Sequence, residues 1–547
     1  MIRQISLSNL YGAYMRLASC LALSLCLAAC SESKSDHKVD ANIISQNYEA
    51  QDWVAKTLPD LSEALEAGDI SAGKLTQSYL NRIDAVDKNG PRLQSVLSIN
   101  PDAMAQAEAS DARRVRGEAI GPLDGVPVLL KDNIETVDPI ATTAGAYALS
   151  ENVTRRDSPL VAGLREQGAV ILGKTNLSQW ANFRSNDSVS GWSAIGGQVR
   201  NPHMLDRSPC GSSSGSGAAI AASLAAGAVG TETNGSIICP SNVNGIVGFK
   251  PTVGLVSQQY IVPISVSQDT AGPMTKTVTG AAMMLSAMDN QDVDYVARLD
   301  SNALQGRRVG VMRFSVGANQ DIQNRFDDVL SSLKEAGAIL VEIENFDLGV
   351  EGYGQKALDV LLYEFKDGLN TYLSESAPSV TTRDLESLIE FNLGHAAEMA
   401  IFDQSLFDQA QAKGDLSDPI YITARQDIQA GTGPNGIDRL LSEFDVDMLV
   451  SPSGPVASRI DPINGDVWPA WSGAGYLAAV AGYPNITVPM GEVHGIPIGF
   501  SIMGSAGQDA ETLSYGYAFE QATKLRVEPK YHKSAEDRVE LKKAMTR

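Results

Sequence analysis

The segment Pro209-Cys-Gly-Ser-Ser-Ser-Gly-Ser-Gly-Ala-Ala-Ile-Ala-Ala-Ser-Leu-Ala-Ala-Gly-Ala-Val-Gly-Thr-Glu-Thr-Asn-Gly-Ser-Ile237 is dominated by Gly, Ala and Ser. Its centre, Ala218 to Gly227, contains only Ala, Ile, Leu, Ser and Gly. Because such short side chains let neighbouring elements approach closely, we predict here a helix that is packed on all sides. The serines on either side of it lie next to glycines, which adopt tight turns at little cost.

Apolar runs upstream and downstream of this segment predict an α/β fold. Val126 to Leu130 and Ala169 to Leu172 are short runs flanked by Gly or Pro, which is typical of buried strands. Pro159 to Glu166, between them, is predicted to be a helix, and residues 309–341 repeat the order strand, helix, strand. Strands that alternate with helices indicate a sheet covered by helices.

The remaining elements complete one domain. We expect helices at Leu385–Phe402 and Tyr421–Ala430, and strands at Asp447–Val450 and Ile486–Pro489. No repeat and no linker-like gap interrupts residues 58–525, which we therefore assign to a single large domain. Residues 526–547 form a charged C-terminal tail, for which we expect either a surface helix or disorder.

The N-terminus is predicted to be an export signal. Residues 1–29 contain two arginines followed by the apolar run Leu17 to Ala29, which is too short to span roughly 30 Å of hydrocarbon. The run ends in Leu-Ala-Ala-Cys30, a sequence similar to a bacterial lipobox, so we expect Cys30 to be lipidated. The polar residues 30–57 would then be a flexible tether. The expected location is the periplasmic face of the outer membrane, with a simply cleaved, soluble periplasmic protein as the alternative.

Composition excludes several classes of function. Lys and Arg total 43 against 65 Asp and Glu, which gives a net charge of −22. Because such a surface repels phosphate backbones, we expect no nucleic-acid partner. The five histidines are scattered, and no Cys/His cluster has the spacing of metal ligands. We therefore predict neither a metal nor an organic cofactor.

Three short motifs are better explained by local structure than by the function that they suggest. Gly168–Thr175 matches a phosphate-binding loop, but its interior is an apolar run that predicts a buried strand. Ser71–Lys74 matches the S-x-x-K of penicillin-binding proteins, but Ser71 stands where a helix N-cap belongs. Gly211–Gly215 matches a nucleophile elbow, but the preceding stretch is polar and contains Pro209, whereas an elbow needs a strand there.

A longer set of motifs resembles the amidase signature family. It comprises the opening segment together with Gly121–Asn133, Thr142–Gly145, Gly173–Asn176, Gly248–Thr252, Asp269–Pro273 and Ala481–Gly491. The resemblance spans about residues 58 to 525 and implies one large α/β domain with a central mixed β-sheet surrounded by helices. Within the family, Thr231–Pro240, Ser267–Met274 and Leu361–Lys366 are most similar to bacterial peptide amidase.

The resemblance implies a Ser-Ser-Lys catalytic triad. Ser236 would be the nucleophile, Ser212 a bridging serine and Lys131 the base, with a cis peptide bond between Gly211 and Ser212. A lysine is a cation at neutral pH unless burial lowers its pKa, and Lys131 ends an apolar run that predicts a buried strand. We therefore expect Lys131 to be buried and uncharged.

The same resemblance implies an oxyanion hole made of the backbone N–H groups of Thr233, Asn234, Gly235 and Ser236. Asn234 replaces a glycine common in the family, and we expect it to tolerate a left-handed conformation and to narrow the site. Ile238-Cys239 stands where many members carry an arginine, which puts a common ion pair in doubt. Cys210 and Cys239 are equally compatible with a disulfide or with two free thiols.

The function that follows is hydrolysis of a carboxylic amide to an acid and ammonia through an acyl-enzyme, on C-terminal peptide amides. The expected substrate is therefore a small-molecule or short peptide amide, with no obligate protein partner and with membrane contact only through the lipid anchor. The alternatives are a general amidase for small aliphatic or aryl amides, a transamidation subunit, or a catalytically silent binding protein.

Overall fold

The computed structural model describes residues 53–468 and 471–546. The predicted signal peptide, the predicted lipidation site Cys30 and the predicted tether up to residue 52 lie outside the described residues. Over the described part of the chain, no helix combines the length and the apolar character that crossing a bilayer requires.

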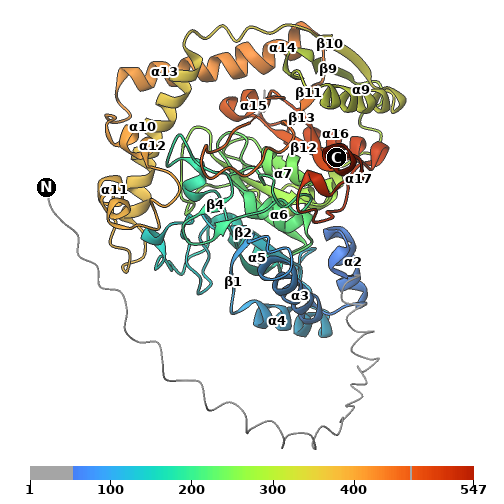
Figure 1. The fold of residues 1–547 in the computed structure, drawn as a ribbon. Coiled ribbons are helices and arrows are strands. Elements are labelled where there is room, and N and C mark those ends of the chain that lie inside the picture. Colours follow the sequence, from blue (N-terminus) through green and yellow to red (C-terminus); the bar gives the residue numbers. More distant parts are fainter. Residues whose placement is uncertain (1–52, 469–470, 547) are drawn as a thin grey trace, which may run out of the picture. The chain divides into compact units, whose positions relative to one another are not determined.

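Within the described residues, eleven strands form one mixed sheet at the centre of a single large α/β domain (Figure 1). From one edge to the other, the strands are β1 (Val96–Ile99), β3 (Val170–Thr175), β2 (Pro127–Lys131), β6 (Gly227–Glu232), β8 (Thr270–Thr275), β7 (Val247–Lys250), β12 (Asn485–Val493), β13 (Ile496–Met503), β11 (Met448–Pro452), β9 (Arg308–Met312) and β10 (Ile339–Ile343). Strand β2 is parallel to both of its neighbours, β3 and β6, whereas β6 and β8 are antiparallel. The predicted fold class is confirmed.

Helices flank the sheet. They are α2 (Leu58–Ala67), α3 (Ala72–Arg82), α4 (Ala103–Val115), α5 (Pro159–Glu166), α6 (Ser214–Ala221), α7 (Ile238–Asn244), α8 (Val278–Met288), α9 (Gln320–Glu335), α10 (Tyr353–Ser374), α11 (Leu385–Gly394), α12 (Ser405–Gln411), α13 (Pro419–Thr432), α14 (Arg439–Glu443), α15 (Gly475–Ala481), α16 (Asp509–Thr523) and α17 (Val539–Met545). Helices α6 and α7 pack against each other; α6 also contacts β2 and β6, and α7 contacts β7. Helices α10 to α13 contact one another at one side of the domain, and α13 also packs against α15 (Figure 1).

Local signals in the sequence explain several of these elements. Ser71 caps α3 as predicted, because its side chain accepts a hydrogen bond from the backbone N–H of Lys74 at 3.2 Å. The phosphate-loop match at 168–175 is confirmed as strand β3, whose residues are all buried. No strand leads directly into the match at Gly211–Gly215, and Ser213 at its centre is buried and bonded to the backbone of Thr231.

The helix predicted at Ala218–Gly227 is wrong in its second half. Helix α6 ends at Ala221, and strand β6 begins at Gly227. Ser223 adopts a left-handed conformation with φ of 60°, and the N–H of Leu224 bonds back to the carbonyl of Ala219 at 2.9 Å. This is the usual way in which a helix C-terminus satisfies its last carbonyl groups. Because the small residues are buried in both elements, their composition does not show the boundary.

The helix predicted at Leu385–Phe402 is also too long, because α11 ends at Gly394. Beyond this point the buried guanidinium of Arg184 donates hydrogen bonds to the backbone carbonyls of Glu398 and Phe402, at 2.6 and 3.1 Å. A cation from a distant part of the chain thus holds these carbonyls away from helical geometry. The C-terminal residues pack on the domain: the N–H of Tyr531 bonds to the carbonyl of Pro202 at 2.9 Å, and α17 follows.

Candidate active site

Lys131 is the last residue of β2, and its side chain is fully buried. Its side-chain nitrogen Nζ lies 2.7 Å from Ser212 Oγ, 2.7 Å from Thr231 Oγ1 and 3.2 Å from the carbonyl oxygen of Thr231. Thr231 stands on β6, the strand paired with β2. The parallel pairing of two buried strands therefore brings Lys131 and Thr231 together.

The surroundings of Lys131 favour the uncharged amine. Burial lowers the pKa of Lys131 to about 7, while the negative charges of Asp269 and Glu232 act in the opposite direction. In the described part of the chain, the hydrogen-bond partners of the Lys131 nitrogen are hydroxyl and carbonyl oxygens and not carboxylates. The predicted burial is confirmed.

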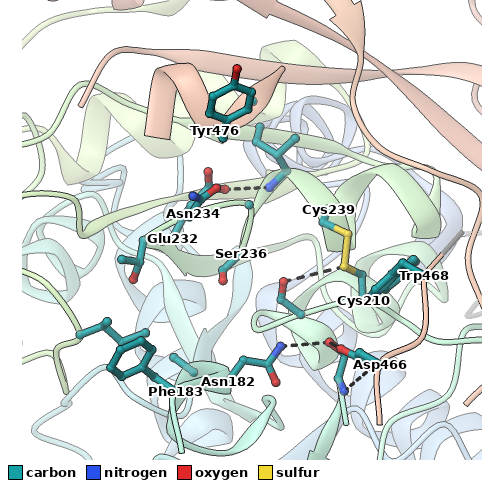
Figure 2. A pocket seen from close by; sticks show the side chains of 18 of the residues that line it. Asn182, Phe183, Cys210, Glu232, Asn234, Ser236, Cys239, Asp466, Trp468 and Tyr476 are labelled. Carbon is teal, nitrogen blue, oxygen red and sulfur yellow. Dashed lines mark hydrogen bonds between the residues drawn. A yellow bond between two sulfur atoms is a disulfide. The ribbon is translucent and has the colours of Figure 1, made fainter. Parts of the chain in front are cut away.

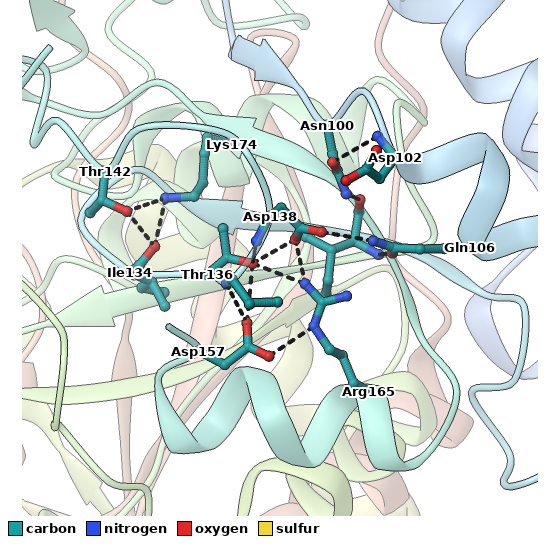
Figure 3. Close-up of polar contacts among 12 residues, drawn as sticks. Asn100, Asp102, Gln106, Ile134, Thr136, Asp138, Thr142, Asp157, Arg165 and Lys174 are labelled. Carbon is teal, nitrogen blue, oxygen red and sulfur yellow. Dashed lines mark hydrogen bonds and ion pairs between the residues drawn. The ribbon is translucent and has the colours of Figure 1, made fainter. Parts of the chain in front are cut away.

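A second buried lysine shows what an ordinary structural role looks like. Lys174, on the neighbouring strand β3, contacts the carbonyl of Ile134 at 2.6 Å and Thr142 Oγ1 at 2.7 Å, and lies 3.7 Å from Asp132 (Figure 3). Lys174 therefore stabilises the segment that follows β2, and its hydroxyl contact is to Thr142 of that segment rather than to a serine of the predicted triad. Close to it, the guanidinium of Arg165 bridges two carboxylates of the same stretch, those of Asp138 and Asp157 (Figure 3).

The position of Ser212 is fixed by a cis peptide bond and by backbone hydrogen bonds. The Gly211–Ser212 peptide bond is cis, as the family resemblance implied. The carbonyl of Ser212 accepts a hydrogen bond from the N–H of Ser178 at 3.1 Å, and the next residue, Ser213, donates its N–H to the carbonyl of Ser236 at 3.2 Å. These bonds place the Ser212 and Ser236 segments side by side. Within the described residues, the hydrogen bonds of the Ser212 hydroxyl include the one to Lys131 but none to the hydroxyl of Ser236.

Ser236 lies on a turn between β6 and α7. The buried carboxylate of Glu232 accepts the N–H groups of Ile237 and Ile238 at 2.8 and 3.0 Å, which fixes the start of α7. The left-handed residue of the turn is Gly235, with φ of 82°, and not Asn234 as expected. A glycine adopts this conformation without strain, so Asn234 is free to keep ordinary geometry.

The backbone N–H groups of this turn are available to a ligand. In the described part of the chain, those of Asn234, Gly235 and Ser236 donate no hydrogen bond to another residue. A Cβ built at Gly235 would meet nothing within 4 Å, so the turn borders open space. Consecutive N–H groups in such a turn can bind a negatively charged oxygen.

Asp269 ties this turn to a neighbouring loop. It accepts the Thr233 hydroxyl at 2.6 Å and the N–H groups of Ile264 and Ser265 at 2.8 and 2.9 Å. Burial raises its pKa to about 6. The sequence predicted no role for Asp269 or Thr231, although both stand inside the motifs quoted for the family.

Cys210 and Cys239 form a disulfide, which decides between the two alternatives that the sequence left open. Their Cα atoms are 5.9 Å apart. Cys210 precedes the cis peptide bond, and Cys239 lies in the first turn of α7. The bond therefore joins the segment of Ser212 to the helix that follows Ser236.

Ser236, the turn before it and the disulfide line one cavity of about 420 Å³ (Figure 2), whereas Lys131 and Ser212 are not among its described lining residues. Apolar side chains form much of its wall: Phe183, Ile264, Leu361, Trp468, Trp471 and Tyr476. Glu232 and Asp466 are carboxylates on the wall, and no lysine, arginine or histidine is among its described lining residues. Nowhere in the described chain do three or more His, Cys, Asp or Glu side chains gather in a way that could hold a metal ion. The site thus offers serine hydroxyls, backbone N–H groups and, through Ser212, a buried lysine amine whose pKa burial lowers to about 7.

Comparisons with known proteins agree with this geometry. The model of the Amidase family matches residues 74–513. A probable amidase of Arabidopsis thaliana is 36% identical over 87% of this chain and 91% of its own length, and a glutamyl-tRNA(Gln) amidotransferase subunit from Halorhodospira halophila is 33% identical over 86% and 97%. The crystal structure of peptide amidase from Stenotrophomonas maltophilia superposes with a TM-score of 0.83 at 44% identity, covering 87% of this chain and 98% of that one. The chain therefore belongs to the amidase signature family and is an amide-hydrolysing enzyme.

Proposed function

We propose that this enzyme cleaves a carboxylic amide to the acid and ammonia, with Ser236 as nucleophile, Ser212 as proton bridge and Lys131 as base. Ser236 Oγ attacks the amide carbon, its proton passes to Ser212, and the proton of Ser212 passes to the neutral Lys131. The proton then returns to the amide nitrogen, ammonia leaves, and an acyl-Ser236 ester remains. Water hydrolyses that ester by the same route and releases the acid.

The contact between Lys131 and Ser212 is the observation that carries this proposal. A buried amine 2.7 Å from a hydroxyl, with a pKa lowered to about 7, is able to accept a proton at neutral pH. The Ser212–Ser236 contact would form when substrate enters, since catalytic hydrogen bonds often tighten only in the complex. The negative charge on the substrate oxygen would then be stabilised by the N–H groups of Thr233, Asn234, Gly235 and Ser236. Each such donor is typically worth about 10²–10³ in rate.

We propose C-terminal peptide amides as the substrates. Support comes from the similarity to a peptide amidase at 44% identity and from a cavity of about 420 Å³, which has room for more than a simple aliphatic amide. The same wall argues against free glutamine, the amide donor of a transamidation subunit. Glutamine carries a carboxylate that would need a cation, and the described lining residues include none.

The test is ammonia release from N-acetyl-Phe-amide, propionamide and free glutamine by the chain purified alone. We expect the peptide amide to have the highest kcat/KM and glutamine the lowest. A fluorophosphonate should label the wild type and leave Ser236→Ala unlabelled. Equal turnover of propionamide would favour the general amidase, efficient glutamine hydrolysis would favour the transamidation subunit, and no turnover with no labelling would favour the silent binding protein.

We also propose export through the N-terminal segment and lipidation at Cys30. The disulfide supports this, because such bonds persist in the periplasm and are rare in the cytosol. Radiolabelled palmitate should be incorporated into the wild type, which should fractionate with the outer membrane. Cys30→Ser should lose both the label and the membrane association. A cytosolic protein that retains Met1 would contradict the proposal.

A further inference from the structure

Two tryptophans on the wall of the cavity belong to a loop that is anchored on both sides. Before them, Asp466 accepts the N–H of Ser190 at 3.0 Å and also bonds the Ser190 hydroxyl. After them, the N–H of Gly473 bonds to the carbonyl of Ser315 at 2.7 Å. Gly473 lies so close to the carbonyl of Pro452 that an added Cβ would come within 2.5 Å of it. The loop is therefore fitted to the domain at both of these points.

The tryptophan pair, Trp468 and Trp471, presents an aromatic surface to the cavity. The two rings meet edge to face, with centroids 5.8 Å apart. Trp468 packs beside the Cys210–Cys239 bond (Figure 2), in the cluster that contains both cysteines. Trp471 remains 49% exposed although it lines the cavity, so part of its ring has no partner in the protein. An exposed indole face in a cavity is a binding surface for another ring or apolar side chain.

The position of the nucleophile decides which part of the substrate meets this surface. If the enzyme acts as proposed above, the leaving group is ammonia, which is smaller than any side chain. Everything else that fills the cavity beside Ser236 must then belong to the acyl part of the substrate. For a peptide amide, the nearest acyl group is the residue that bears the scissile amide.

The charges on the wall restrict that residue further. Glu232 and Asp466 line the cavity, and both carboxylates already accept hydrogen bonds from the protein. The lining residues that the structure describes include no cation. An acidic side chain placed here would meet two like charges and no counter-ion, whereas an uncharged or cationic one would not be repelled.

From these contacts we infer that Trp468 and Trp471 determine specificity: they bind the side chain of the residue that bears the scissile amide and select an aromatic or large apolar one. This inference rests on the proposed amide hydrolysis and adds the side-chain class to it. The acidic wall rejects Asp and Glu at the same position.

The test compares kcat/KM for four blocked amides: N-acetyl-Phe-amide, N-acetyl-Gly-amide, N-acetyl-Glu-amide and N-acetyl-Lys-amide. We expect Phe to exceed Gly by about tenfold or more, Glu to be the poorest, and Lys to exceed Glu. Trp471→Ala should lower kcat/KM for Phe by about tenfold through KM and leave Gly within about twofold. The matched control is Trp53→Ala, because Trp53 packs on the main core outside the cavity wall and should leave the ratio of Phe to Gly unchanged.

The outcomes separate two failures. If no amide is hydrolysed by the folded wild type, the proposed function is wrong, and this inference fails with it. If the amides are hydrolysed but Phe and Gly differ by less than twofold, or Glu matches Phe, the inference alone is wrong. The same holds if Trp471→Ala lowers the Phe and Gly values equally. The wild-type panel tests the side-chain preference even if the variant folds poorly, and Trp471→Ala tests the part that the tryptophan plays in it.

Discussion

Replacing Lys131 with methionine should abolish activity and, at neutral pH, stabilise the protein. Methionine has a similar length but cannot accept a proton. Because general-base catalysis typically contributes 10²–10⁴-fold, we expect kcat/KM for ammonia release to fall at least about a hundredfold. A residue kept only for packing would behave in the opposite way, because its loss would cost stability.

The expected gain in the stability of Lys131→Met follows from the burial of the lysine amine. Burial moves the pKa of Lys131 from 10.5 to about 7, and at about 1.36 kcal/mol per pKa unit this costs the folded state about 5 kcal/mol at or below pH 7. Methionine removes this cost but also removes two hydroxyl contacts, worth about 1 kcal/mol each. The expected net gain is about 3 kcal/mol. Unfolding entropy of about 2.1 cal/mol/K per residue converts this gain into a rise of about 3 °C in Tm.

The pH dependence of the folding stability has a definite sign. Between pH 7 and 10.5 the unfolded chain keeps the lysine proton that the folded chain has lost, so wild-type stability rises with pH over this range. The advantage of Lys131→Met should therefore be complete below pH 7, and the variant should be the less stable protein by about pH 10. Calorimetric Tm values of both proteins at pH 6, 8 and 10 measure this crossover.

Lys276 provides the matched control. Burial lowers its pKa to about 7 as well, but it contacts the carbonyls of Val54, Ala55 and Lys56, away from the candidate site. Lys276→Met should keep kcat/KM within about threefold. The reasoning is refuted if Lys131→Met retains more than a tenth of the activity or loses several degrees of Tm at pH 7. If both variants lose activity equally, the loss reports the fold and not the base.

Three further predictions concern the same site. Because only neutral Lys131 accepts a proton, kcat/KM should fall about tenfold per unit below about pH 7, and a flat acid profile would exclude this base. Replacing both Cys210 and Cys239 with serine removes a cross-link between residues that are 29 positions apart. The free energy of unfolding, measured by denaturant titration, should fall by about 3–4 kcal/mol. An unchanged denaturation midpoint would show that the bond does not stabilise the domain. Asp269→Asn should lower kcat about tenfold with KM nearly unchanged, because the Asp269 carboxylate binds Thr233 in the turn that carries the proposed oxyanion hole. It should also move the acid limb to lower pH, since Asp269 raises the pKa of Lys131; a change in KM alone would contradict this role.

Patterns of a few consecutive residues determined the local secondary-structure elements of this protein. The apolar run before Lys131 predicted β2, and the position of Ser71 predicted the start of α3. These signals are local because a strand pattern and an N-cap each depend on a few consecutive residues. The family motifs likewise predicted the cis bond before Ser212 and identified the residues of the proposed triad.

Only the tertiary structure decided the environment of those residues. Whether Lys131 is uncharged depends on complete burial and on Thr231, which stands 100 positions later and meets it through strand pairing. The path of the chain after α11 is fixed by Arg184, which lies more than two hundred residues earlier and binds the carbonyls of Glu398 and Phe402. Trp468 reaches the cavity wall through a loop anchored at both sides. Desolvation and long-range contacts are properties of packing, so no pattern of neighbouring residues reveals them.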